Sequence, residues 1–166
     1  MVSIVMVFAA LTSAYLVRQA EGNWLEYSLP SVLWVSSIII LMSSVTAQLS
    51  LRSLKKGNDS VAKIILAITI LLGIAFMISQ FNAWETLVAN EVYFVGNPGG
   101  SFLYVLTGFH GFHLISGIIY LIVIFIMIST KKVNKENSLP MELSTTYWHF
   151  LDGLWLYLFV FLLLNH

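Results

Sequence analysis

The apolar residues of this chain gather into five long runs that short polar segments separate. Each run is close to the roughly 20 residues that a helix needs to cross about 30 Å of hydrocarbon. The runs are continuous rather than alternating, which excludes a membrane barrel and leaves helices to satisfy the backbone in lipid. The sequence therefore predicts an all-α polytopic membrane protein, a single domain formed by a bundle of five transmembrane helices. The expected spans cover approximately residues 1–17, 32–51, 64–84, 102–128 and 147–164.

Composition supports a membrane protein and excludes several other classes. Of 166 residues, 58% are hydrophobic and only 10% are charged, whereas a soluble domain carries about a quarter charged residues. The formal net charge is zero, which argues against a nucleic-acid partner because such a partner requires a basic face. The absence of cysteine excludes disulfides, thiolate metal sites and a cysteine nucleophile.

The first run lacks the basic start and the small-residue cleavage site of a signal peptide. We therefore interpret it as a mature span. Its length is marginal for crossing the membrane, and a few residues upstream of Met1 would complete it.

Basic residues are concentrated in two of the four predicted loops. The loops after the second and fourth spans hold seven of the eight basic residues. Positively charged loops stay on the cytoplasmic side, so we expect the N-terminus inside and the C-terminus outside. Trp24, Trp34, Trp84 and Tyr93 are then expected near the outer boundary, as interface aromatics. The seven basic residues are Arg52, Lys55, Lys56, Lys63, Lys131, Lys132 and Lys135.

Two histidines in the fourth span, His110 and His113, are three residues apart and share a helix face. Gly117 falls on the same stripe, so another helix can pack closely against it. A metal or haem ligand pair is one interpretation, but a closed site needs three or four ligands. His149 starts its span from the opposite side, roughly 15 Å away in height. We therefore favour buried imidazoles that form hydrogen bonds to neighbouring helices, with no metal.

His149 and Asp152 are also three residues apart, near the inner end of the fifth span. A carboxylate within a span needs a partner. A proton relay and a lipid-headgroup contact are functional interpretations of this pair. We favour a hydrogen bond that fixes the fifth helix against a neighbour.

Three further polar residues lie at the ends of spans. Gln80, near the outer end of the third span, is expected to bond another helix, while Glu85 can reach water. Glu142 lies just before the fifth span, where the helix dipole favours an anion. The sequence contains no Ser-His-Asp set, phosphate loop or dinucleotide fingerprint.

At these positions the chain resembles subunit III of the haem–copper respiratory oxidases, the cytochrome c oxidase type. Residues 147–155 read Tyr-Trp-His-Phe-Leu-Asp-Gly-Leu-Trp, against Tyr-Trp-His-Phe-Val-Asp, two small apolar residues and Trp in the family. Residues 107–113 match its pattern of Thr-Gly, apolar, His-Gly, apolar, His. Glu142 and the stretch from Gln80 to Glu85 also match. The resemblance covers essentially the whole chain.

The resemblance implies a non-catalytic subunit of an oxidoreductase complex in a bacterial cytoplasmic membrane. Such a subunit packs on the catalytic subunit I beside other oxidase subunits and supports proton uptake and active-site integrity. Haem and copper are expected in the partner subunits and none in this chain, whereas bound phospholipid is expected between its helices. Tyr147, Trp148 and Trp155 are candidates for lipid or subunit contacts.

Two positions depart from the family pattern. The family carries a glutamate in the first span where this chain has Ile4, so the role in proton handling or lipid contact associated with that glutamate is not carried over. Gly153 stands where the family has a branched residue, which would allow a neighbouring helix to approach closely.

Three alternative functions stay open from the sequence. The chain fits an accessory subunit of a quinol oxidase or nitric oxide reductase. It also fits an autonomous proton conductor that uses His149, Asp152 and Glu142. A haem- or metal-binding membrane enzyme using His110 and His113 is the third.

Overall fold

The computed structural model describes residues 1–22, 31–92, 94, 96 and 98–165, and every regular element in these residues is an α-helix. Each of the five helices overlaps one predicted span and is long and apolar enough to cross a membrane. The all-α prediction is confirmed. Trp24 and Tyr93, expected at the outer boundary, lie outside the described residues. The helices are α1 (Val2–Ala20), α2 (Val32–Lys55), α3 (Asp59–Ala89), α4 (Pro98–Ser129) and α5 (Leu139–Asn165).

The helices extend beyond the apolar runs because hydropathy marks only the part suited to hydrocarbon. The clearest case is α5, which begins at Leu139 rather than near residue 147. Pro140 suits a first turn, where its missing N–H has no partner to lose. Ser138 precedes the helix and donates to Glu142 Oε1 at 2.7 Å. Ser138, Pro140 and Glu142 therefore favour a helix start that precedes the apolar run.

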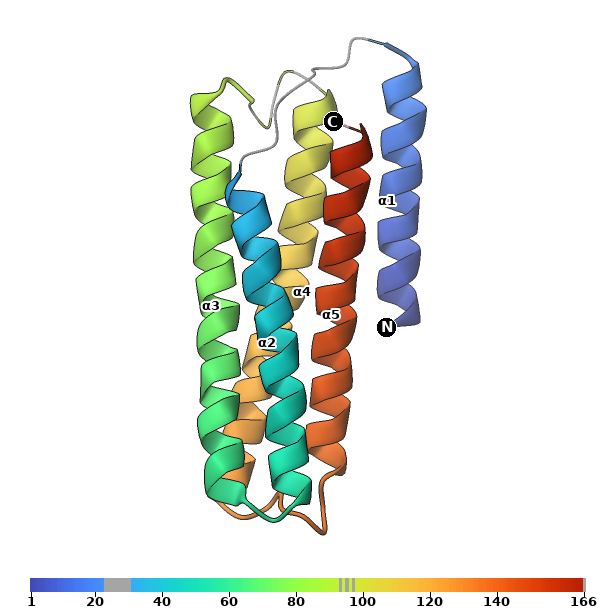
Figure 1. Cartoon of the computed structure of the whole chain (residues 1–166). Coiled ribbons are helices and arrows are strands. Elements are labelled where there is room, and N and C mark those ends of the chain that lie inside the picture. Colours follow the sequence, from blue (N-terminus) through green and yellow to red (C-terminus); the bar gives the residue numbers. More distant parts are fainter. Residues whose placement is uncertain (23–30, 93, 95, 97, 166) are drawn as a thin grey trace.

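Four helices form an up-and-down bundle, and α1 packs on its outside (Figure 1). Within the bundle, α2 and α4 each contact α3 and α5, and α1 contacts α4 from the outside. The first helix is joined to the end of α5 because Tyr15 donates from its hydroxyl to the Asn165 carbonyl at 2.6 Å. Its N-terminal end lies well above the turns that join α2 to α3 and α4 to α5 (Figure 1).

Small hydroxyl residues bring α2 and α3 close together. Ser50 donates from Oγ to the Ala62 carbonyl at 2.7 Å, and Thr69 donates to Thr46 Oγ1 at 2.9 Å. Gly57, with a φ of +84°, reverses the chain between the two helices, a conformation that favours glycine. The pair is held by packing and by hydrogen bonds within the interface, as expected for helices in lipid.

The indole of Trp148 fills the centre of the bundle, against glycines of two neighbouring helices. A Cβ built at Gly73 of α3 would lie 2.9 Å from the ring, and one at Gly117 of α4 would lie 3.1 Å from it. The predicted close approach at Gly117 is therefore confirmed, and α5 supplies the neighbour. Both positions are restricted to glycine because the ring occupies the space of a side chain.

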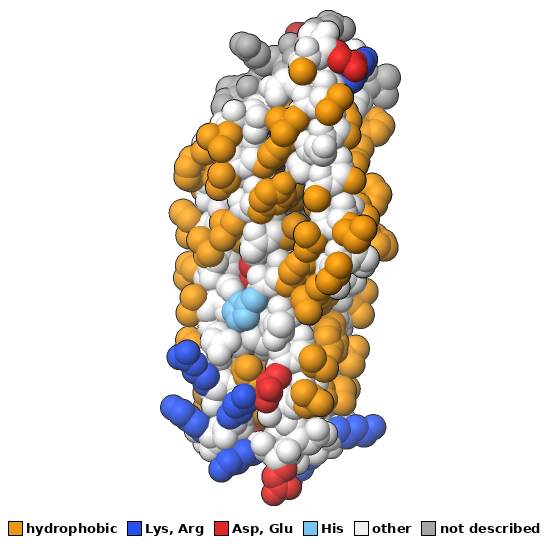
Figure 2. Space-filling model, turned by 90° about the vertical axis from the view of Figure 1, so that its right-hand side faces the viewer, with side chains coloured by type: hydrophobic (Ala, Val, Ile, Leu, Met, Phe, Trp, Pro, Cys, Tyr) orange, Lys and Arg blue, Asp and Glu red, His pale blue; other side chains and the backbone are white. Residues whose placement is uncertain are grey.

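The outer surface is apolar along its sides and charged at its ends (Figure 2). Large hydrophobic side chains are exposed on all five helices, far more than a soluble protein presents. Basic side chains gather at one end, around the turns after α2 and α4, as Figure 2 shows. This surface suits lipid or other membrane subunits along the sides and water at the ends.

Candidate functional site

His149 connects α5 to α2 through both nitrogens of its ring. Nε2 lies 3.2 Å from Gln48 Oε1, and Nδ1 is hydrogen-bonded to the Ser44 hydroxyl. Because an amide oxygen only accepts, this network assigns the proton to Nε2 and makes Nδ1 the acceptor for Ser44. The predicted hydrogen bond that fixes the fifth helix against a neighbour is therefore confirmed.

Asp152 lies one turn above His149 and is 3% exposed. Its carboxyl group lies near the Ser44 hydroxyl. That contact is looser than a hydrogen bond, since neither carboxyl oxygen has a hydrogen-bond partner among the described residues. An unpaired buried carboxylate is costly as an anion. His149, Ser44 and Asp152 thus form a polar group at the α2–α5 interface, inside an otherwise apolar bundle.

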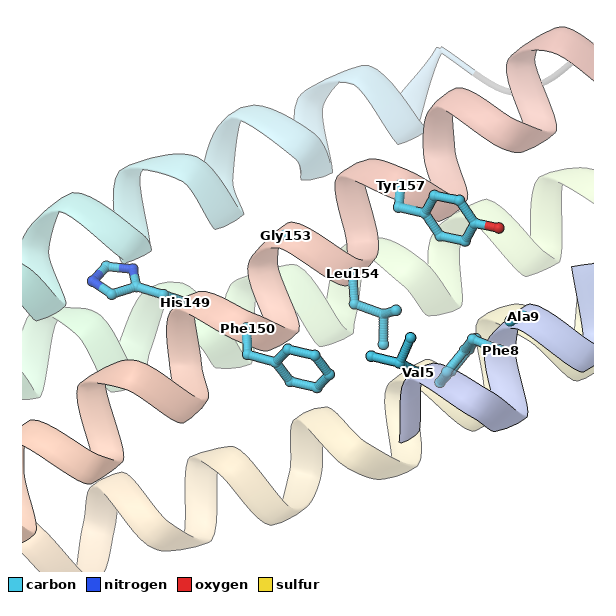
Figure 3. A pocket seen from close by; sticks show the side chains of 8 residues that line it. All are labelled: Val5, Phe8, Ala9, His149, Phe150, Gly153, Leu154 and Tyr157. Carbon is cyan, nitrogen blue, oxygen red and sulfur yellow. The ribbon is translucent and has the colours of Figure 1, made fainter. Parts of the chain in front are cut away.

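An apolar cleft of about 490 Å³ lies beside this group, between α1 and α5. Figure 3 shows Val5, Phe8 and Ala9 of α1 facing Leu154 and Phe150 of α5, with His149 at one end of the cleft. Gly153 borders the cleft, and a Cβ there would meet nothing within 4 Å. The expected close approach of a helix at Gly153 is therefore wrong, since the missing side chain opens space instead.

His149 also lines a second, more polar groove of about 330 Å³ on the α2 side. Ser44, Gln48 and Arg52 contribute its polar groups. Arg52 belongs to the basic end of the molecule, one turn beyond Gln48 on the same helix. His149 therefore lines both hollows, the apolar one toward α1 and the one that contains Arg52 toward the basic end.

His110 and His113 face different neighbours although they share a face of α4. The His110 ring is 1% exposed and packs against Trp155, with ring centroids 5.2 Å apart. The His113 ring packs edge-on against Phe8 of α1 at 6.0 Å. Its Nδ1 bonds the Phe109 carbonyl of its own helix at 2.7 Å. Burial of His110 agrees with a packing role.

The hydrogen bonds to neighbouring helices that were predicted for His110 and Gln80 are not formed. Neither nitrogen of His110 and neither polar atom of Gln80 has a hydrogen-bond partner in the described part of the chain. The prediction that Gln80 bonds another helix is therefore wrong. Gln80 lies beside His110 at a small cavity between α3 and α4 instead. Glu85 is exposed at the end of α3, in agreement with its expected access to water.

Glu142 lies in the first turn of α5, as predicted, and it also contacts α2. Its Oε1 is 3.1 Å from Lys55 Nζ and accepts from Ser138 at 2.7 Å. The ion pair is half exposed, so its contribution to stability is small. It joins the end of α2 to the start of α5 at the basic end of the bundle.

The expected lipid or subunit contacts at the tryptophans are wrong. Trp148 and Trp155 are buried in the bundle, at 0% and 1% exposure. Their Nε1 atoms donate to α2 serines, Trp148 to Ser43 at 3.0 Å and Trp155 to Ser37 at 3.1 Å. Tyr147 is half-buried, and its hydroxyl lies 2.9 Å from Ser116 Oγ of α4. An indole needs an acceptor when it is buried, and the serines supply one.

The serines of α2 are the residues that sequence reasoning missed. Ser37 and Ser44 are seven residues apart, as are Ser36, Ser43 and Ser50. Seven residues are close to two helical turns, so each set lies on one face. This spacing was a readable signal for a hydroxyl-bearing face. Within the described residues, no group of three or more histidine, aspartate or glutamate side chains converges as metal ligands.

Comparison with known proteins places these features in a family. The family model for cytochrome c oxidase subunit III matches residues 27–165. The chain is 30% identical to cytochrome c oxidase subunit 3 of Corynebacterium diphtheriae, over 93% of this chain and 79% of that protein. It is 34% identical to cytochrome bo(3) ubiquinol oxidase subunit 3 of Pseudomonas aeruginosa, over 80% of this chain and 63% of that protein.

Longer relatives match over a smaller share of their length. Cytochrome c oxidase subunit 3 of Paracentrotus lividus is 37% identical over 76% of this chain, which spans 47% of that protein. The family match, from residue 27 to residue 165, includes both histidine motifs and all of α2 to α5. This chain belongs to the cytochrome c oxidase subunit III family.

Proposed function

We propose that this chain is a non-catalytic subunit of a haem–copper oxidase, packed against the catalytic subunit in a bacterial cytoplasmic membrane. Its role is to support proton uptake and active-site integrity in that partner, which holds the haem and copper. The observation that carries the proposal is that His149, Trp148 and Trp155 are engaged in contacts between helices of this chain. These residues hold the bundle together and leave its long apolar flanks to contact other subunits and lipid.

The orientation of the chain in the membrane follows from the end of the bundle that carries the basic side chains. The N-terminus lies inside and the C-terminus outside, with the turns after α2 and α4 in the cytoplasm. The His149–Asp152 group is then on the cytoplasmic half of the membrane, the side from which an oxidase takes up its protons. The relatives include subunits of both cytochrome c oxidases and quinol oxidases, and the electron donor is set by other subunits of the complex.

A bound phospholipid belongs to the same proposal. The cleft between α1 and α5, of about 490 Å³, has a mostly apolar lining suited to an acyl chain, and His149 lines both this cleft and the groove bearing Arg52. A lipid seated there places its phosphate near a guanidinium and an imidazole, both suited to an anionic headgroup. Its tail then covers Val5 and Leu154.

The decisive experiment compares the oxidase with and without this chain, following haem and copper spectra and oxygen consumption over time. We expect nearly intact spectra, a partly retained initial rate and failure of sustained turnover in the depleted complex. Asp152→Leu should reproduce the failure more strongly than Asp152→Asn, which keeps the shape and some hydrogen bonding. Haem absorbance that is lost on depletion and restored by this chain alone would contradict the proposal, as would proton flux through the purified chain in liposomes.

The lipid is tested by native mass spectrometry of the purified complex. Gly153→Leu places a branched side chain in the cleft without meeting any atom of the bundle at its Cβ. We expect this variant to lose phospholipid mass that the parent complex retains. Val123→Leu, at an exposed position of α4 that does not line the cleft, is the control and should retain the lipid. Equal lipid content in the Gly153→Leu variant and the parent complex would contradict the assignment to this cleft.

A further inference from the structure

The cavity between α3 and α4 has two polar side chains in its wall that nothing in the bundle satisfies. Gln80 comes from α3 and His110 from α4, and both line it. Gln80 is 8% exposed and His110 is 1% exposed. The amide oxygen, the amide nitrogen and both imidazole nitrogens have no hydrogen-bond partner among the described residues. Buried polar groups are paired in the great majority of proteins, so this pair requires an explanation.

The imidazole of His110 is held in place by aromatic rings. Trp155 lies tilted against it with centroids 5.2 Å apart, and Phe76 meets it edge-on at 6.1 Å. These contacts use the faces and edges of the ring but supply no acceptor or strong donor to its nitrogens. The ring is therefore fixed beside Gln80, and its hydrogen-bonding capacity is left for a small ligand.

The rest of the wall decides what kind of ligand fits. Met77 and Phe81 make it mostly apolar. Thr107, at the same wall, donates to the Leu103 carbonyl at 2.7 Å and accepts from Trp84 Nε1 at 3.2 Å, so its hydrogen is already used. A methyl or acyl group in the cavity would leave the amide and imidazole unpaired. An ion would need charged partners, which these side chains do not supply.

The space matches one water molecule. The volume open to the centre of a water-sized sphere is about 20 Å³, and one water needs at least about 10–15 Å³ together with two to four polar partners. Gln80 offers a donor and an acceptor, and a neutral imidazole offers one of each. We propose that this cavity binds one internal water molecule, which bridges Gln80 of α3 to His110 of α4.

The test is a double-substitution cycle on the intact oxidase complex, with the thermal unfolding midpoint as the readout. Gln80→Met and His110→Phe each remove one partner at similar size. Each single variant should lower the midpoint, because the partner left behind stays buried and unsatisfied. The double variant should lower the midpoint by clearly less than the sum of the two single-variant decreases, because it removes both polar groups together. Additive losses would overturn the proposal.

A control double substitution and a density map distinguish a bridging water from other causes of coupling between Gln80 and His110. His113 does not line the cavity, so Gln80→Met combined with His113→Phe should give additive losses, and coupling there as strong as with His110 would overturn the proposal. A cryo-electron microscopy map of the parent complex at about 2 Å should show one isolated peak within hydrogen-bond distance, about 3 Å, of both side chains. Density continuous with a lipid or another subunit, or direct contact between Gln80 and His110, would overturn it.

Discussion

The indole nitrogen of Trp148 on α5 donates a 3.0 Å hydrogen bond to the hydroxyl oxygen of Ser43 on α2, in the fully buried centre of the bundle. Ser43 in turn donates to the Thr69 carbonyl of α3 at 3.3 Å. One short chain of hydrogen bonds thus links three helices through two side chains. In lipid such bonds contribute to helix association because apolar surface alone gives little preference for protein over hydrocarbon.

The first prediction concerns this bond. Ser43→Ala removes the acceptor and leaves the Trp148 N–H buried without a partner. We expect the unfolding free energy of the chain in mild detergent to fall by about 0.6–2 kcal/mol. Thermal or denaturant unfolding measured by near-ultraviolet circular dichroism detects the loss, because the tryptophan signal reports directly on this site.

The control is Ser36→Ala. Ser36 is equally buried, but its hydroxyl donates only within its own helix, to the carbonyls of Val32 and Leu33. Its removal should lower stability by clearly less than Ser43→Ala does, because no hydrogen bond between helices is lost. A loss as large as that of Ser43→Ala would show that any buried hydroxyl matters equally, and that the bond between helices has no special role.

The second prediction concerns the glycines around Trp148. Gly117→Ala places a Cβ 2.9 Å from Leu151 Cδ1 and 3.1 Å from the Trp148 ring. The Leu151 side chain or the Trp148 ring must then shift, and we expect a destabilisation of about 1–3 kcal/mol. Gly73→Ala should behave similarly, because its Cβ would lie 2.9 Å from the same ring. Unfolding of the purified variants in detergent measures both.

Gly153→Ala provides the matched comparison in a helix. A Cβ there meets nothing within 4 Å, and alanine is favoured over glycine in a helix interior by roughly 0.5–1 kcal/mol. This variant should be as stable as the parent or slightly more stable. If all three substitutions destabilised the chain alike, close packing on Trp148 would not be the reason that glycine is present at 73 and 117.

The third prediction tests the proposed orientation. The chain has no cysteine, so single cysteines can be introduced without a background signal. Lys56→Cys lies at the basic end of the bundle, and Gly96→Cys lies at the opposite end, before α4. An impermeant thiol reagent applied from outside should label the cysteine at 96 and leave the one at 56 unlabelled until the membrane is permeabilised. The reverse pattern would invert the topology.

The fourth prediction separates packing from cofactor binding at the histidines of α4. His110→Gln and His113→Gln should leave the haem and copper content of the complex unchanged, as measured by its optical spectrum and by metal analysis. His110→Gln should reduce stability more, because that ring is 1% exposed and packs on Trp155. Loss of a redox centre in either variant would show that these histidines hold a cofactor.

The sequence alone determined the number and type of the helices and the family. A helix that crosses lipid must be about 20 residues long and apolar, and it satisfies its own backbone, so each span is encoded locally. The spacing of His149 and Asp152 likewise indicated a shared face near the inner end of α5. The hydrogen bonds of His149 to Ser44 and Gln48 confirm that this face contacts another helix.

Only the tertiary structure decided which neighbour each side chain meets. Trp148 and Trp155 were expected at the surface and are buried, Gln80 and His110 lack the direct bonds expected of them, and Glu142 contacts Lys55 of another helix. The physical reason is that lipid and the interior of a helix bundle are similarly apolar. Hydrophobic periodicity, which separates core from surface in water, therefore carries little information about which helix face is covered by protein.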